Sequence, residues 1–352
     1  MSAKGKLSLL LVILLAFALV VAGCGSKEPA PAPAPPSEGD PAPVQEAVKD
    51  YPKTLTLGSA SIGGVYHVYG GAWAQIIERS LGVPTAVEVT GGPNQNMILI
   101  QNKDAELGMI TMGPAWEAWH GEGDWTGGVE HKDVRVIFPM YNTYSSWWAS
   151  EKSGIKSLGD LEGKTIGVGP AGGTSGTYHP RILELLGIKT TNRLAGASDL
   201  ASQHIDGQIA ANSFASGIPM PTVLETAAQM KINVFGVDGE YRDKVVSEWP
   251  YWSPAVIPAS TYDFLKDDVE TIGIWNMAVA HKDLSDEFVY DMVKAVFENQ
   301  SDLVIATKSA EETVPENISN NNWMWMHPGA IRYYEEIGIK LSPDVYPPEY
   351  KK

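Results

Sequence analysis

The 352-residue sequence contains a single cysteine, Cys24, and few basic residues. One cysteine allows no disulfide within the chain and no cysteine-based metal site. The 26 lysines and arginines stand against 42 acidic residues, for a formal net charge of −16. Such an acidic chain argues against nucleic acid as a partner and against a body lying flat on anionic lipid. It leaves an anionic ligand open, because the local field of a site can oppose the global charge.

Signatures of common enzymes are also missing. The sequence has no H-E-x-x-H and no G-x-S-x-G, and its seven histidines lack metal-ligand spacing. Residues 159–165, GDLEGKT, place three residues between glycines where a phosphate loop needs four. We therefore expect no enzymatic activity, no cofactor and no metal site. His67 and His179 are expected to cap or hydrogen-bond within their loops. A secreted transferase that uses Ser175 is the enzymatic alternative.

The N-terminal segment predicts export and a lipid anchor. Lys4 and Lys6 precede an apolar run over 9–22, which is shorter than the roughly 20 residues of a membrane span. Residues 21–24, VAGC, resemble a lipobox, so we expect a signal peptide over 1–23 and acylation of Cys24. An incidental cysteine in an ordinary signal is the alternative. The Pro/Ala-rich residues 24–53 predict an extended tether on the outer, periplasmic side of the membrane.

The rest of the chain alternates between strand and helix patterns, which predicts the α/β class with a mostly parallel sheet. We expect two α/β lobes with a ligand cleft between them. Lobe 1 would comprise 54–146 and 270–352, and lobe 2 would comprise 147–269. The expected strands cover 55–58, 85–90, 105–111, 134–140, 145–150, 164–168, 210–214, 232–237 and 273–280. The expected helices cover 73–80, 93–101, 177–186 and, as the most amphipathic, 286–306.

Three glycine-rich loops, 59–64, 91–96 and 169–177, each follow a strand pattern and precede a helix pattern. Helix N-termini carry partial positive charge and unpaired N–H groups, so they bind carboxylates and phosphates without a cation. Glycines in such turns can also serve backbone geometry alone. We expect at least two of the loops to line one site.

Tryptophans cluster in the first half of the folded part, at Trp116, Trp119, Trp125, Trp147 and Trp148. Most are expected to pack in the core or between lobes. An aromatic cage for a quaternary ammonium group is the alternative.

Several segments in order resemble one family. GSASIGGVYHVYGGAWA (58–74) is similar to the G-T-Y-Y-x-x-G segment of the solute receptors of TAXI-type TRAP transporters. VTGGPNQNMILIQNKDAELGMI (89–110) resembles their T-G-G-S-x-x-N segment, and 157–188 resembles their D-L-x-G-K-x-V-x-V-G-x-x-G-S-G-T segment. The resemblance continues through HIDGQIAANSFASGIPMPTVLE (204–225) and into the C-terminal part, and it covers 55–339.

This resemblance implies a two-lobed, periplasmic-binding-protein-like receptor. It would bind a small organic anion (a dicarboxylate, 2-oxoglutarate or a glutamate-like solute) and deliver it as a monomer to a TRAP-type membrane permease. Val65 and His67, where the family often has Thr and Tyr, bear on which solute fits. The alternatives are a ligand-sensing lipoprotein that docks on a membrane signalling partner, and a receptor for a zwitterionic or amine solute held by aromatics.

Matching positions imply a set of ligand-binding residues contributed by the three loops and by a wall of the cleft. Hydroxyl and N–H groups suffice for an anion, because charge-assisted hydrogen bonds are roughly twice as strong as neutral ones. The set is Ser59, Ser61, Gly64, Val65, Tyr66, Thr90, Gly92, Asn96, Thr174, Ser175, Gly176, Thr177, Phe214, Ser216 and Gly217.

Overall fold

The computed structural model describes residues 49–351, which lie in one compact unit. The predicted signal peptide, Cys24 and the tether up to residue 48 fall outside the described residues. Of the last tether residues, Lys49 forms an ion pair of 2.9 Å with Asp291, and the Tyr51 ring packs edge-on against Phe288. Within residues 49–351, no helix combines the length and the apolar character that crossing a membrane requires.

All strands of this unit join one mixed sheet in the order β2-β1-β3-β10-β4-β7-β5-β6, with β8 added to β4 and β9 to β10. β1, β2 and β3 pair in parallel, and so do β5, β6 and β7. The strands are β1 (Leu55–Gly58), β2 (Thr85–Glu88), β3 (Leu107–Thr111), β4 (Val134–Ser150), β5 (Thr165–Gly167), β6 (Thr191–Arg193), β7 (Ala211–Ser216), β8 (Ile232–Phe235), β9 (Ser253–Ile257) and β10 (Val269–His281).

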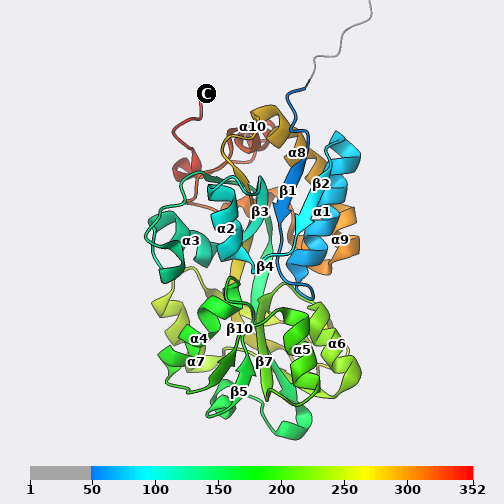
Figure 1. The fold of residues 1–352 in the computed structure, drawn as a ribbon, viewed down its shortest axis with the longest axis vertical. Helices are drawn as coiled ribbons and strands as arrows, with labels where there is room; N and C mark the ends of the chain where they lie inside the picture. The colour runs from blue at the N-terminus through cyan, green and yellow to red at the C-terminus, as the bar shows by residue number, and fades with distance from the viewer. Residues whose placement is uncertain (1–48, 352) are drawn as a thin grey trace, which may run out of the picture. The chain divides into compact units, whose positions relative to one another are not determined.

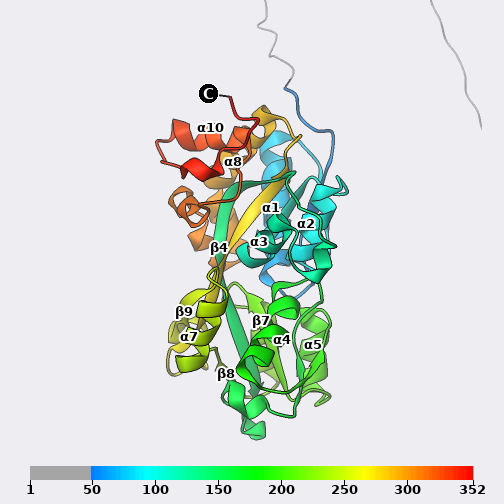
Figure 2. The ribbon, with the colours of Figure 1, turned by 90° about the vertical axis from the view of Figure 1, so that its left-hand side faces the viewer.

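Helices cover both faces of this sheet. They are α1 (Val65–Leu81), α2 (Pro93–Gln101), α3 (Met112–His120), α4 (Thr174–Leu186), α5 (Ala197–Ile205), α6 (Pro221–Gln229), α7 (Gly239–Glu248), α8 (Asp286–Glu298), α9 (Gln300–Ala306) and α10 (Pro328–Glu336). Figure 1 shows α1–α3 and α8–α10 around one end of β4 and β10, and α4–α7 around the other. In Figure 2, α8 and α10 lie on the opposite side of β4 from α2 and α3, whereas α1 packs against α8 and α9.

Two long antiparallel strands, β4 and β10, run through both groups of helices. Val134 to Tyr144 of β4 pairs with β10, and Tyr144 to Ala149 pairs with β7. β10 in turn pairs with β9 through Val269 to Gly273. The predicted lobe boundary at 146/147 therefore lies inside β4, in the part that pairs with β7, and the boundary at 269/270 lies at the start of β10. The division into lobes stays a prediction.

The sequence predicts a mostly parallel sheet, but the sheet is mixed, because β4 and β10 pair with their neighbours in antiparallel fashion. Three of the expected elements differ most from the structure. The two strands expected at 134–140 and 145–150 are one, because residues 141–144 continue the pairing with β10. The single helix expected over 286–306 ends at Asn299, whose φ of −117° and ψ of 27° leave the helical region and separate α8 from α9. α1 begins at Val65 rather than at residue 73, and the glycines at 70 and 71 lie inside the helix rather than before it. The helix expected over 93–101 is confirmed as α2.

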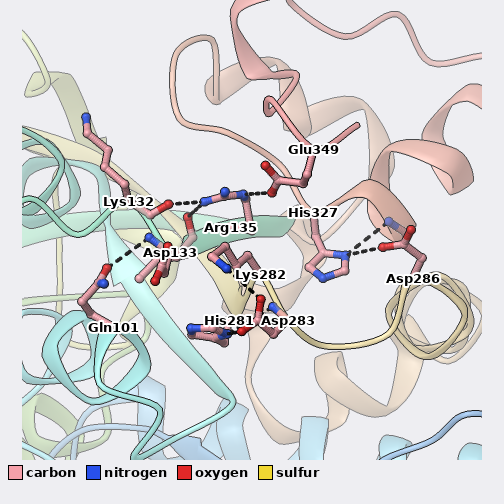
Figure 3. A network of polar contacts seen from close by, with 12 residues as sticks. Gln101, Lys132, Asp133, Arg135, His281, Lys282, Asp283, Asp286, His327 and Glu349 are labelled. Carbon is pink, nitrogen blue, oxygen red and sulfur yellow. Dashed lines mark hydrogen bonds and ion pairs between the residues drawn. The ribbon is translucent and has the colours of Figure 1, made fainter. Parts of the chain in front are cut away.

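A buried polar network anchors the C-terminal segment to the start of β4. The Arg135 side chain is 2% exposed, and its Nε donates to Glu349 Oε1 at 2.7 Å. Figure 3 shows Arg135 between the Lys132 carbonyl and Glu349, with His327 facing Asp286 nearby. Burial, together with the charge of Arg135, lowers the pKa of His327 to about 4. This network lies at the β4–β10 end that the α8–α10 group covers, away from the glycine-rich loops.

Candidate functional site

Three helices begin at glycine-rich loops and lack a side-chain cap. The N-cap residues of α1, α2 and α4 are Gly64, Gly92 and Gly173, and none of them provides a side-chain hydrogen bond to its helix. The first N–H groups of a helix have no partner within the helix, and together with the helix dipole they give that end a partial positive charge. Each of the three loops therefore presents a positive helix end.

These three helix ends meet at one small cavity of about 30 Å³. Residues from α1, α2, α4 and four strands or their ends line it, and none of the lining residues is charged. They are Ala60, Gly64, Val65, Tyr66, Pro93, Thr111, Thr143, Thr174, Ser175, Phe214, Ala215, Ser216 and Asn276. A cavity that binds benzene measures roughly 150 Å³, so a solute of several heavy atoms needs this site to open.

Asn276 of β10 organises the polar floor of the cavity. Its Oδ1 accepts a hydrogen bond from the Tyr66 hydroxyl at 2.6 Å, and its Nδ2 donates to the Tyr141 carbonyl at 2.6 Å. Thr143 Oγ1 lies 2.7 Å from Asn276 Nδ2. Burial raises the pKa of Tyr66 well above its usual value, so its hydroxyl keeps the proton that it donates to Asn276.

Direct hydrogen bonds join the two sides of the cavity. Thr111 Oγ1, at the end of β3, lies 2.7 Å from Thr174 Oγ1 of α4. Asn94 Nδ2 of α2 donates to Thr177 Oγ1 at 3.1 Å, and the Val65 N–H donates to Ser216 Oγ at 3.3 Å. The structure is therefore closed, with hydroxyl groups as the contacts between its two sides.

Glycine is required where the loops before α2 and α4 touch. Gly92 has a φ of +119°, which residues with a Cβ rarely adopt. A Cβ at Gly92 would also stand 3.0 Å from the Cα of Gly173. The two backbones thus approach as closely as they do because neither residue has a side chain.

Among the polar side chains that line the small cavity, that of Ser175 has no hydrogen-bond partner within residues 49–351. Its residue is 1% exposed, and its Oγ has no hydrogen-bond partner among the described residues. A buried unpaired hydroxyl is costly, so its presence at a cavity wall calls for an explanation. It lies in the first turn of α4, beside the positive helix end, where it can donate to an anion.

A sequence model of the NMT1-like family matches residues 57–338. The chain belongs to the NMT1-like family. Two solved structures share the fold of this NMT1-like chain. The periplasmic binding protein BugD is 12% identical, with a TM-score of 0.54, over 83% of this chain and 100% of BugD. MatC from Rhodopseudomonas palustris, solved with bound malate, is 15% identical, with a TM-score of 0.53, over 81% of this chain and 96% of MatC. The predicted α/β fold of periplasmic binding proteins is thus confirmed.

The structure of the NMT1-like chain brings seven of the predicted ligand residues to the small cavity. They are Gly64, Val65, Tyr66, Thr174, Ser175, Phe214 and Ser216. The other eight do not line it. They are Ser59, Ser61, Thr90, Gly92, Asn96, Gly176, Thr177 and Gly217.

Most of the eight brace the loops instead. Asn96 Nδ2 donates to the carbonyls of Ser59 and Met109, at 2.8 and 2.9 Å, and Thr90 Oγ1 lies 2.8 Å from Asn96 Oδ1. Gly176 packs so tightly that a Cβ there would meet the Pro170 carbonyl oxygen at 1.9 Å. These residues hold the backbone of the helix ends in place.

The prediction missed three polar lining residues, Thr111, Thr143 and Asn276. Thr111 ends an otherwise apolar strand, and Asn276 interrupts the apolar run of β10. A polar residue inside an apolar strand pattern is the signal that would have found them, since a buried polar group needs a partner or a ligand.

His179 is a core residue. It is fully buried against Trp147, with Nε2 3.0 Å from Ser145 Oγ and Nδ1 2.7 Å from Ser213 Oγ. Burial lowers its pKa to about 3, so the ring is neutral. Among residues 49–351, no group of three or more His, Cys, Asp or Glu side chains is placed to hold a metal ion.

Proposed function

We propose that this NMT1-like chain is the extracytoplasmic solute receptor of a membrane transporter, of the TAXI type of TRAP systems that its sequence resembles. It would bind a small organic anion and deliver it to the permease. One observation supports an anionic solute: three helix N-termini, whose glycine N-caps provide no side chain, meet at a cavity lined by hydroxyl and amide groups and by no charged side chain. Helix ends of this kind bind carboxylates.

The negative net charge of the chain is consistent with a site built from helix ends rather than from charged side chains. A formal charge of −16 repels anions at long range, so the attraction must come from fixed dipoles at short range. Charge-assisted hydrogen bonds from Ser175 and the first N–H groups of α4 would hold a carboxylate. The malate in the structure of MatC, which has the same fold, suggests dicarboxylates as the first solutes to test.

Solute entry requires movement, since the cavity of about 30 Å³ is too small for a dicarboxylate. We propose that the lobes 54–146 with 270–352 and 147–269 separate about β4 and β10, the two strands they share. Opening breaks the contacts of Thr111 with Thr174 and of Asn94 with Thr177. A solute that bridges both sides then shifts the equilibrium toward the closed state.

The lipid anchor at Cys24 and the tether belong to the same proposal. They would keep a monomeric receptor on the outer face of the membrane, within reach of its permease. The chain would act without chemistry on its solute, so binding without turnover is expected.

The test is titration calorimetry of the purified chain against malate, 2-oxoglutarate and glutamate, with the diamide of malate as an uncharged control. We expect one of the acids to bind with a Kd in the micromolar range or tighter, about −8 kcal/mol. The diamide should bind at least about a hundredfold more weakly, because two charge-assisted contacts are lost. Equal binding of acid and diamide, or no heat from any acid, would contradict the proposal.

A further inference from the structure

A second, much larger cavity of about 780 Å³ lies beside the small one. It is formed by α3, the end of α7 and the turn after it, β10, and residues 320–323. The two cavities are adjacent, because residues next to each other in the chain line them. Thr111 lines the small cavity and Met112 the large one. On β10, Asn276 lines the small cavity and Trp275 the large one. The volume falls in the roughly 300–1,000 Å³ range of ligand sites.

Five aromatic rings line this large cavity: those of Trp116, Trp249, Tyr251, Trp275 and Trp323. Trp116 and Trp323 touch edge to face, with ring centroids 5.3 Å apart. Trp249 and Tyr251, which follow α7, both pack against Tyr178 of α4, at 6.0 and 5.7 Å. Aromatic faces attract cations, and tryptophan does so most strongly.

Carboxylates complete the lining. The negative charge of Glu117 is balanced by Arg181, which donates a hydrogen bond to its carboxylate at 2.6 Å. The same carboxylate accepts hydrogen bonds from Tyr178 at 3.0 Å and from Trp125 at 2.7 Å. Three others, at 122, 124 and 248, also line the cavity, and among residues 49–351 none of them forms an ion pair or a side-chain hydrogen bond. The cavity therefore combines aromatic faces with an excess of negative charge, which disfavours an anion and favours a cation.

We propose that this large cavity is a second binding site, which takes an organic cation carrying an ammonium group. The Glu117–Arg181 ion pair, which belongs to the lining of the cavity, connects α3 to α4, so an occupant contacts elements from both helix groups. A bound cation would accordingly stabilise the same closed arrangement that the anion site requires. The two cavities share no lining residue, so binding at this site can be tested separately from the anion proposal.

The experiment compares two probes of equal shape and different charge. Choline and its uncharged isostere 3,3-dimethylbutan-1-ol are titrated into the full chain by calorimetry at low salt, and binding is repeated in Ser175→Ala to separate it from the anion site. We expect choline to bind at least about tenfold more tightly than the alcohol. Spermidine as a third probe distinguishes primary from methylated ammonium groups. Equal binding of choline and the alcohol, or binding of neither choline nor spermidine at about 10 mM, overturns the proposal.

Two matched triple variants test the location. The first is Glu122→Gln, Asp124→Asn and Glu248→Gln, which neutralises the unpaired carboxylates of the cavity. The control is Glu225→Gln, Glu240→Gln and Asp263→Asn, which removes the same charge from exposed positions outside it. Choline affinity should fall at least about fivefold in the first variant and less than about twofold in the control. An equal loss in both would show a general charge effect and would overturn the site.

Discussion

Ser175 and Ser213 are two buried serines of the same lobe for which the structure predicts opposite behaviour. Each is 1% exposed. Ser175 Oγ has no partner among the described residues, whereas Ser213 Oγ accepts from His179 Nδ1 at 2.7 Å and donates to the Gly167 carbonyl at 3.0 Å. Replacing each by alanine removes a single oxygen atom, so the two variants are matched in size and chemistry.

In Ser175→Ala, no hydrogen bond of the empty protein is lost. Its free energy of unfolding should therefore stay the same or rise, because an unpaired buried hydroxyl is removed. Affinity for an acid should fall about 10- to 100-fold, since a hydrogen bond to a charged group contributes roughly 1.5–3 kcal/mol. In Ser213→Ala, His179 and the Gly167 carbonyl lose their partner, and the free energy of unfolding should fall by about 1–3 kcal/mol.

Urea denaturation without solute measures the two stabilities, and calorimetry with the tightest acid of the panel measures the two affinities. Affinity of Ser213→Ala should stay within about twofold, since Ser213 does not line the small cavity. If Ser175→Ala lost stability like Ser213→Ala and kept its affinity, the hydroxyl would have a structural partner, and the assignment of the cavity as the anion site would be refuted.

Further outcomes concern the loops, pH and the anchor. Gly92→Ala should lower the free energy of unfolding by about 1–3 kcal/mol and weaken acid binding, because Gly92 has a φ of +119°. Gly71→Ala, in open space within α1, should raise the free energy of unfolding by about 0.5–1 kcal/mol. Thermal melts compare the stabilities of the two variants, and calorimetry compares their affinities. The pKa of His327 is lowered to about 4 from an ordinary 6.5, so the unfolded chain takes up the proton first as the pH falls. The free energy of unfolding should therefore fall below about pH 6.5, by about 2 kcal/mol at pH 5. Urea melts of His327→Asn, whose side chain can still cap α10, should show a weaker pH dependence. Cys24→Ser should release the protein from the membrane fraction, and its retention there would argue against acylation.

Local patterns in the sequence were enough to find the glycine-rich loops of the site, although they placed the starts of α1 and α4 too late, at residues 73 and 177. A glycine at the N-cap provides no side chain to cap its own helix, because the N-cap side chain is set by the local sequence. The loops before α1, α2 and α4 were predicted in this way, and all three helices begin at a glycine cap. Which loop residues face the cavity was harder to predict: Ser175 lines it, whereas Asn96 braces two carbonyls.

The sequence by itself therefore determined the α/β class, the glycine-capped helix ends and the absence of disulfides, since these depend on local spacing and composition. Tertiary structure alone decided that Thr111, Thr143 and Asn276 share one cavity, because β3, β4 and β10 are neighbours only in the assembled sheet. It also decided that tryptophans at 116, 275 and 323 line one large cavity. Contacts between residues so far apart in the chain arise from strand order, which no local pattern specifies.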